Sequence, residues 1–239
     1  MSVRLRASAA LWLLSIAASC FAADCSVAVD VGHFLEHPGA SSARGATEFQ
    51  FNVELARAVQ RSIQHRGCRA SLIGERGDVS ELRTRTTLAR DAALFLSVHH
   101  DSVAEKFLER WVIVGVDRMY SDRFAGFSLF VSHDNSYPER SLRCASAIGA
   151  ALRSAGFSPS LFHADPAFGE VRPFADERNG VHWFDGLVVL RTASQPAVLL
   201  EAGMLINRNE ELMLQRPDVR EKIGSVLAGA IMDCLAGRP

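Results

Sequence analysis

The sequence has no cluster of lysine and arginine, no internal repeat, no low-complexity tract and no linker rich in proline or serine. Basic residues number 26, acidic residues number 27, and the formal net charge is −1. A chain with this balance lacks the basic patch that binds nucleic acid, so we expect no nucleic-acid partner. Without a linker or a repeat, 239 residues predict one domain of catalytic size.

Only one long apolar run occurs, and it lies near the N-terminus. It follows Arg4 and Arg6 and is itself followed by small residues, which is the layout of a secretory signal peptide. We therefore predict a signal peptide over residues 1–22, cleavage after Ala22, and a mature domain over 23–239 that is periplasmic or secreted. Because no second such run follows, we do not expect an integral membrane protein.

The sequence has five cysteines and no Cys-x-x-Cys spacing, so a zinc ribbon is not indicated. Cys20 lies in the predicted signal peptide, where a poor lipoprotein motif argues against lipidation. Cys25 and Cys68 each precede a predicted strand, and they would lie side by side if those strands were parallel neighbours. Cys144 and Cys234, on later helices, would then form a second disulfide in an exported protein. The alternative is four reduced, buried thiols.

Strand-like and helix-like segments alternate along the mature chain. Thr47 and Ser80 are the expected N-caps of the first two helices. The alternation predicts an α/β fold, a single domain with a mostly parallel twisted sheet flanked by helices on both faces. The expected strands cover 27–31, 68–74, 93–101, 110–116, 126–132 and two segments within 187–203; the expected helices cover 46–67, 80–92, 138–156 and 216–237; and 157–186 is interpreted as irregular.

Two histidines and two glutamates stand at the ends of these elements. His33 follows the first strand, and His99 comes near the end of the third. Glu48 opens the first helix on its apolar face, and Glu201 ends the last strand. Ligands gather at the carboxyl ends of the strands in such sheets, so we expect these four side chains to meet at one edge.

Two imidazoles and one carboxylate suit Zn²⁺, and a second carboxylate nearby would serve as a general base. Each residue also has an ordinary interpretation. His33 fits a strand-end histidine bonded to a loop, and Glu48 fits a first-turn glutamate favoured by the helix dipole. There is no His-Glu-x-x-His spacing, so the residues alone leave a metal hydrolase and a purely structural role open.

Five motifs follow one another along the chain. They are a strand ending in Asp-x-Gly-His, a Gly-x-x-Glu at the next helix, a Leu-x-x-Arg-x-x-x-Ala, a strand ending in Ser-Val-His, and a final Pro-x-x-Leu-x-Glu-x-Gly-x-x-x-Asn. The matching residues are Asp30, Gly32, His33, Gly45, Glu48, Leu82, Arg85, Ala89, Ser97, Val98, His99, Pro196, Leu199, Glu201, Gly203 and Asn207. As a set, these motifs resemble those of the zinc-dependent N-acetylmuramoyl-L-alanine amidases of the amidase-3 family.

The resemblance implies that His33, Glu48 and His99 bind Zn²⁺ and that Glu201 is the catalytic carboxylate. It implies hydrolysis of the amide between N-acetylmuramic acid and the L-alanine of the stem peptide, with peptidoglycan as substrate and, as in some relatives, an activator protein as partner. No long inserted helix is recognisable, so an occluded site is not predicted. Departures such as Arg90 affect loop shape and substrate preference, and the segment 157–186 does not align.

Other polar and aromatic residues receive structural interpretations first. Asp30 is expected either to orient a ligand imidazole or to serve the strand end. Arg85 is expected to pack or pair near the sheet edge, and contact with a substrate carboxylate is the alternative. His100, which faces away from His99 on the strand, is expected either to support a ligand side chain or to pack. Structural roles are expected for Asp101 and Asn207, surface or loop positions for His37, His163 and His182, and core or sugar-groove positions for Trp111 and Trp183, the last being the better groove candidate.

Two rival functions remain at this point. A zinc peptidase or deacetylase would use the same donors and base, and only the motif set separates it from an amidase. A peptidoglycan-binding module without catalysis would be expected to lack Glu201 or one of the donors, and all four are present.

Overall fold

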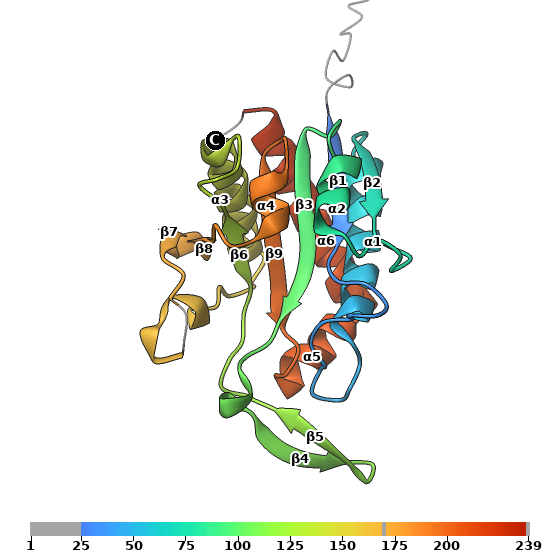
Figure 1. Ribbon diagram of the computed structural model, residues 1–239, viewed down its shortest axis with the longest axis vertical. Helices are drawn as coiled ribbons and strands as arrows, with labels where there is room; N and C mark the ends of the chain where they lie inside the picture. Colours follow the sequence, from blue (N-terminus) through green and yellow to red (C-terminus); the bar gives the residue numbers. More distant parts are fainter. Residues whose placement is uncertain (1–24, 169–170, 238–239) are drawn as a thin grey trace, which may run out of the picture.

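The computed structural model describes residues 25–168 and 171–237, so the predicted signal peptide and Cys20 lie outside the described residues. Seven strands form one sheet in the order β2-β1-β3-β9-β6-β8-β7 (Figure 1). They are β1 (Ser26–Val31), β2 (Arg69–Ile73), β3 (Leu94–Asp101), β6 (Ser128–Val131), β7 (Phe174–Asp176), β8 (Val181–Trp183) and β9 (Ala197–Met204).

The sheet is mostly parallel, as predicted. Strands β2, β1, β3 and β9 run in one direction, so their carboxyl ends meet at one edge. Strand β6 is antiparallel to β9, β8 is parallel to β6, and β7 reverses again. The carboxyl ends of β6 and β8 therefore lie at the opposite edge.

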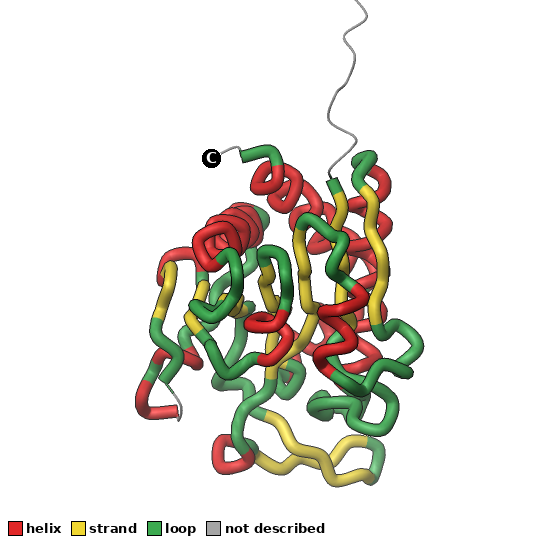
Figure 2. The backbone as a smooth tube through the Cα atoms, turned by 45° about the horizontal axis from the view of Figure 1, so that its top comes forward, coloured by secondary structure: helices red, strands yellow, loops and turns green. Residues whose placement is uncertain are grey.

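Helices cover both faces of the sheet (Figures 1 and 2). The larger apolar core lies between the sheet and α1, α3 and α6, and a smaller one lies beneath α2 and α4. The helices are α1 (Glu48–His65), α2 (Leu82–Leu88), α3 (Pro138–Ser154), α4 (Val188–Thr192), α5 (Arg208–Gln215) and α6 (Pro217–Leu235), with short 3-10 turns at Glu105–Phe107, Phe162–Ala164, Pro166–Phe168 and Glu177–Asn179.

The first helix begins where its sequence predicts. Thr47 accepts a hydrogen bond from the backbone N–H of Gln50, and the Gln50 side chain accepts one from the backbone N–H of Thr47. This capping box satisfies two backbone donors that a helix start leaves without partners. For α2 the expected cap, Ser80, is wrong, because Glu81 is the N-cap and accepts from the N–H of Arg83.

Four segments differ from their predicted structure. The first strand expected within 187–203 is the helix α4, since a short apolar run alone does not distinguish a buried strand from a buried helical turn. The strand expected over 110–116 is instead a hairpin of β4 (Glu109–Ile113) and β5 (Val116–Tyr120), which projects beyond the sheet (Figure 1). The segment 157–186 contains β7 and β8, and α5 was not predicted.

Both expected disulfides are present. Cys25–Cys68 joins the starts of the parallel neighbours β1 and β2, with the two Cα atoms 5.1 Å apart. Cys144–Cys234 joins α3 to α6, with the Cα atoms 5.2 Å apart. None of the helices within residues 25–168 and 171–237 is long and apolar enough to span a membrane.

His182 is not the surface or loop histidine that was predicted. It lies in β8 with no exposed surface, next to Phe130 and Phe174, and its Nδ1 bonds to the carbonyl of Arg172. Burial lowers the pKa of His182 to about 4. The unfolded chain therefore binds a proton near pH 6.5 that the folded chain excludes.

We expect this histidine to make the fold sensitive to acid. Below about pH 6.5 the unfolded chain gains a proton at His182, so stability falls until the folded-state pKa is reached, by about 2.5 kcal/mol at about pH 4.5. Between about pH 7 and pH 4.5, the free energy of unfolding of His182→Gln should therefore fall by about 2.5 kcal/mol less than that of wild type. Urea unfolding at both pH values would measure this difference. His133→Gln, at an exposed histidine, is the control. Parallel pH profiles for wild type and His182→Gln would contradict the prediction.

Candidate active site

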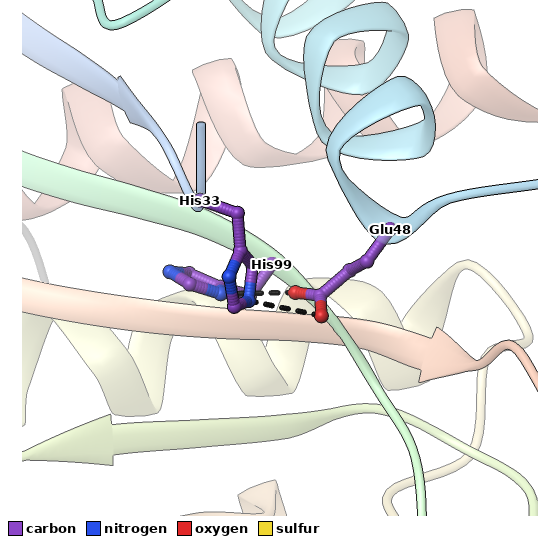
Figure 3. A group of neighbouring side chains, drawn as sticks. All are labelled: His33, Glu48 and His99. Atoms are coloured by element: carbon purple, nitrogen blue, oxygen red, sulfur yellow. Dashed lines mark hydrogen bonds and ion pairs between the residues drawn. The ribbon is translucent and has the colours of Figure 1, made fainter. Parts of the chain in front are cut away.

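The structure brings His33, Glu48 and His99 together at the carboxyl edge of the parallel strands (Figure 3). The Nε2 of His33 lies 3.0 Å from Oε2 of Glu48, and Nδ1 of His99 lies 3.0 Å from Oε1. One donor atom from each residue lies within 4.8 Å of the other two. The predicted convergence of these three residues is therefore confirmed.

A buried arginine fixes the backbone that carries His33. His33 has a left-handed backbone, with φ of +67°, which is unusual for a residue other than glycine. Arg85 donates from Nη2 to the carbonyl of His33 at 2.5 Å and from Nη1 to the carbonyl of Val31 at 2.5 Å. The same Nη1 pairs with Oδ1 of Asp30 at 2.8 Å, and both side chains are 1% exposed. The pairing expected for Arg85 is thus confirmed.

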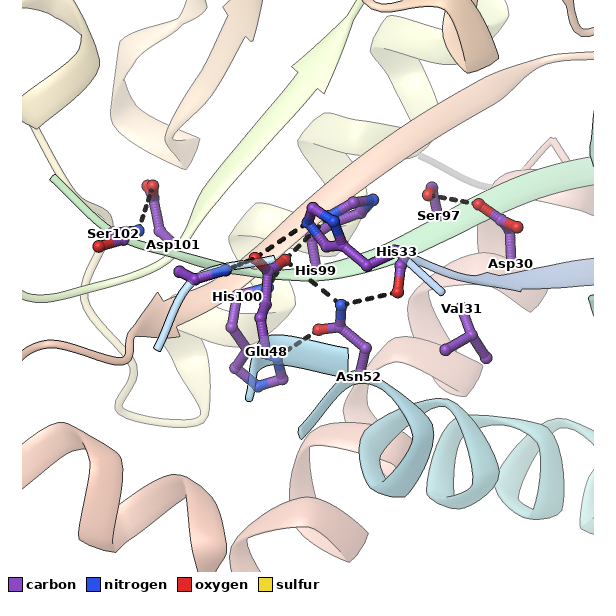
Figure 4. Close-up of polar contacts among 12 residues, drawn as sticks. Asp30, Val31, His33, Glu48, Asn52, Ser97, His99, His100, Asp101 and Ser102 are labelled. Atoms are coloured by element: carbon purple, nitrogen blue, oxygen red, sulfur yellow. Dashed lines mark hydrogen bonds and ion pairs between the residues drawn. The ribbon is translucent and has the colours of Figure 1, made fainter. Parts of the chain in front are cut away.

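Asp30 does not bond to a ligand imidazole. Its Oδ2 accepts a hydrogen bond from the Ser97 hydroxyl on β3 at 2.7 Å (Figure 4), and its Oδ1 pairs with Arg85 on α2, so both oxygens have structural partners. Of the two roles that the sequence left open, the structure supports the structural one.

Glu48 is held from several directions. The backbone N–H of Ala40 donates to its Oε2 at 3.1 Å, and the Asn52 side chain and the backbone N–H of His100 both donate to its Oε1 at 3.3 Å. Burial acts to raise the pKa of Glu48, but hydrogen bonds and charge from His33 and His99 outweigh it and hold the pKa well below its usual range. The carboxylate stays ionised, as a metal donor must be.

His100 packs on the other side of β3, as expected. Burial lowers its pKa to about 3, so the ring is neutral. Its Nδ1 bonds to Oδ1 of Asn52 at 2.8 Å, which leaves the Asn52 amide nitrogen to donate to Glu48 and to the carbonyl of Gly32 (Figure 4). Asn52 was not among the predicted site residues; its signal in the sequence is a polar side chain one helical turn after Glu48, on the buried face of α1.

Two glycines lie against the donor side chains, where a side chain of their own would not fit. A side chain on Gly32 would collide with the imidazole of His99, and one on Gly39 would collide with the Glu48 carboxylate and the His33 ring. Gly39 also has φ of +78°, which favours glycine. The donor group therefore depends on the close approach of two backbone segments.

Gly32→Ala is expected to displace His99 and lower metal affinity about 10- to 100-fold, the usual cost of disturbing the support of a ligand. Competition with a chelator would measure this change, and circular dichroism would check that the fold remains. Gly229→Ala is the matched control, since nothing lies within 3.7 Å of its new methyl group. Equal affinity of Gly32→Ala and wild type would contradict the interpretation.

Glu201 lies beside the donor group. It is in register with His99 across the β3–β9 ladder, so the two side chains point to the same face of the sheet. The residue is half-buried, and its Oε2 is buried without a hydrogen-bond partner among the described residues. Burial raises the pKa of Glu201 well above its usual value, and the charges of Asp101 and Glu48 raise it further. A carboxyl group in this environment takes up a proton readily.

The donor set fits a zinc ion. Two imidazole nitrogens and one carboxylate oxygen converge, and three protein donors leave further positions open. The orphaned oxygen of Glu201 on the same face is a buried polar atom that a polar ligand would satisfy.

The remaining predicted residues lie elsewhere. Asn207 is the N-cap of α5 and Trp111 packs in the hairpin, bonded to the carbonyl of Ala43, so both are structural. Trp183 ends β8 at the opposite edge of the sheet from the donor group, where its ring stacks on that of His133 with the centroids 3.7 Å apart. His163 lies in a loop segment, as one of its two predicted positions had it, in the 3-10 turn Phe162–Ala164, but its side chain is largely buried and bonded to Asp101.

Fold and site together place the chain among α/β domains that carry a His–Glu–His donor group at the carboxyl ends of a parallel sheet. The family model for N-acetylmuramoyl-L-alanine amidases of the amidase-3 type matches residues 27–233, and the chain belongs to this family. It is therefore an amidase of peptidoglycan, of the class that hydrolyses the bond between N-acetylmuramic acid and L-alanine.

Solved structures show the same fold. The chain is similar to the amidase Ami1 from Mycobacterium smegmatis, with a TM-score of 0.71 and 17% identity over 91% of this chain and 99% of that one. It is also similar to the catalytic domain of the amidase CwlV from Bacillus (Paenibacillus) polymyxa, with a TM-score of 0.66 and 22% identity over 89% and 98%. The CwlD amidase from Clostridioides difficile, in complex with the GerS lipoprotein, has a TM-score of 0.66 and 18% identity over 90% and 100%. No curated protein matches the sequence.

Proposed function

We propose that the chain hydrolyses the amide between N-acetylmuramic acid and L-alanine with Zn²⁺ held by His33, Glu48 and His99, and with Glu201 as the general base. The observation that carries this proposal is the convergence of three donor atoms within 4.8 Å, next to a carboxylate in register with one of the donors. When bound, zinc supplies a Lewis acid that polarises the amide carbonyl and makes water more acidic.

The residues of the chain perform the proton transfers. Glu201 accepts the proton of the attacking water and delivers it to the nitrogen of L-alanine as the bond to the lactyl carbonyl breaks. Its raised pKa suits both halves of this task, because a carboxyl that holds a proton well also returns it to an amine. Asn52, His100 and Arg85 keep the donors in place through the hydrogen bonds described above.

Both rival functions are less well supported. A binding module without catalysis has no need of an intact donor group with a buried carboxylate beside it, and burying such a group is costly. A zinc peptidase or deacetylase would use the same chemistry, but the family to which the chain belongs acts on the muramoyl-alanine bond.

We also propose that the chain is exported through the signal peptide over 1–22 and acts on peptidoglycan outside the cytoplasm. The substrate of the family and the two disulfides, which persist in oxidising compartments, support this localisation. The complex of CwlD with the GerS lipoprotein supports an activator protein as a second partner.

The function is tested by digesting purified sacculi with the zinc-loaded mature chain and identifying the products by mass spectrometry. Free stem peptides that begin with L-alanine, together with intact glycan strands, are expected. Dialysis against a chelator should remove the activity and added Zn²⁺ should restore it. Release of cross-link fragments or of acetate in place of stem peptides would identify a peptidase or a deacetylase, and release of nothing would refute the proposal.

A further inference from the structure

A second pair of titratable side chains lies close to the candidate active site. The Nε2 of His163, in the 3-10 turn Phe162–Ala164, lies 2.6 Å from Oδ2 of Asp101 at the end of β3. The two side chains are 19% and 9% exposed. The function proposed above gives neither residue a role.

Contacts on both sides place the His163 ring over the middle of the sheet. Asp101 belongs to β3 and His182 to β8, and β9 and β6 lie between these strands. The His163 ring is bonded to Asp101, and its centroid lies 5.9 Å from that of His182 and 5.0 Å from that of Phe130 on β6. The imidazole therefore covers β9 and β6 on the face from which Phe130 projects.

Glu201 projects from that same face. In the β6–β9 ladder Phe130 pairs with Leu199 and Ser128 pairs with Glu201, and paired residues point to one side of a sheet. Asp101 is near enough for its charge to act on the Glu201 carboxyl. His163 and Glu201 are thus neighbours over the same two strands.

The hydrogen bond to Asp101 fixes what His163 offers. A carboxylate only accepts, so Nε2 carries the hydrogen, and in the neutral ring Nδ1 is then an acceptor. No described residue bonds to this Nδ1, and it is not among the buried atoms that lack a partner, so it is open to solvent. The pair presents one free acceptor over the strands β9 and β6, the first of which carries Glu201.

We propose that His163 is a further catalytic residue, whose Nδ1 accepts a hydrogen bond from the N–H of the amide that is cleaved. This inference rests on the proposed function. Holding that hydrogen orients the nitrogen, so that the lone pair that forms as the nitrogen becomes tetrahedral faces Glu201, which delivers the proton. Asp101 is a positioning residue that holds the ring.

His163→Gln tests this role, because the glutamine amide can still donate to Asp101 but has nothing in place of Nδ1. Two substrates are compared: a muramoyl-L-alanyl peptide, and its ester analogue with L-lactate for L-alanine, which has no N–H to donate. We expect kcat/KM on the amide to fall about 10- to 100-fold, and on the ester to stay within about threefold of wild type. Metal content and melting temperature should match wild type.

His133→Gln is the matched control. His133 also pairs with an aspartate, through Nδ1 at 3.1 Å from Oδ2 of Asp185, but it follows β6 at the opposite edge of the sheet. The kcat/KM of this variant on both substrates should equal that of wild type.

The outcomes separate the two proposals. If His163→Gln loses equal kcat/KM on the amide and on the ester, His163 has a structural role. If the variant keeps full activity on the amide, His163 has no role in the reaction. Either result overturns this inference and leaves the proposed amidase function intact. A wild-type enzyme that cleaves neither substrate refutes the proposed function, and the role of His163 with it.

Discussion

Glu201→Gln is expected to lower kcat by about 10³- to 10⁴-fold, with metal content equal to that of wild type. Glutamine has nearly the same shape but cannot accept the proton of water or return it to the leaving amine. Product release from sacculi would measure the loss, and metal analysis would show that the His33, Glu48 and His99 donors are intact. An active Glu201→Gln variant would show that the base is assigned wrongly.

The same change is expected to stabilise the metal-free protein. Burial raises the folded-state pKa of Glu201 above its unfolded value, so the charged form opposes folding at any pH above about 4.5. Neutral glutamine removes that cost, and we expect a gain of about 1–3 kcal/mol in the free energy of unfolding at about pH 7. The gain should disappear below about pH 4, where the carboxyl is protonated in both states.

Glu210→Gln is the matched control for both measurements. Glu210, on α5, accepts hydrogen bonds from the backbone N–H groups of Gly126 at 2.9 Å and Met204 at 2.8 Å, so its carboxylate has partners. Burial raises the pKa of Glu210 as well, but less far because of these backbone hydrogen bonds. Its replacement should therefore leave kcat unchanged and give a smaller gain in stability than Glu201→Gln. A stabilised Glu210→Gln together with a destabilised Glu201→Gln would contradict this interpretation of the two buried carboxyls.

The candidate site was predictable because each of its residues stands at a recognisable element end. His33 and His99 interrupt or end apolar strands, and Glu48 follows a capping threonine on the buried face of a helix. Parallel strands bring such ends to one edge whatever their distance in sequence. The disulfide Cys25–Cys68 followed from the same reasoning, because parallel neighbours also share their starting edge.

What the sequence did not predict depends on long-range packing. The partner of His163 is 62 positions away, in a segment without periodicity, so neither the burial of the ring nor its bond to Asp101 has a local signal. The segment over 187–190 is apolar in either conformation, and only its packing over the smaller core makes it helical. Strand β6 runs antiparallel to β9, so β8 beside it ends, with Trp183, at the edge of the sheet opposite the site. The sequence of a strand does not encode the direction in which it runs in the sheet.

Arg85→Met is expected to destabilise the fold by about 3–5 kcal/mol, the usual cost of leaving one member of a buried ion pair without its partner. The change leaves the Asp30 carboxylate without a countercharge in the core and removes the donors to the carbonyls of Val31, His33 and Val79. Urea unfolding at about pH 7 would measure the loss. Adding Asp30→Asn should restore part of it, because the uncompensated charge is then gone.

The conservative variant Arg85→Lys separates the two tasks of this side chain. A lysine keeps the charge beside Asp30, but its single nitrogen cannot serve the aspartate and the carbonyls on either side of the left-handed turn. We therefore expect most of the stability to return, while affinity for Zn²⁺ stays about 10- to 100-fold below wild type because His33 is no longer fixed. If Arg85→Lys binds zinc as tightly as wild type, the turn at His33 holds without the guanidinium, and Arg85 contributes to folding alone.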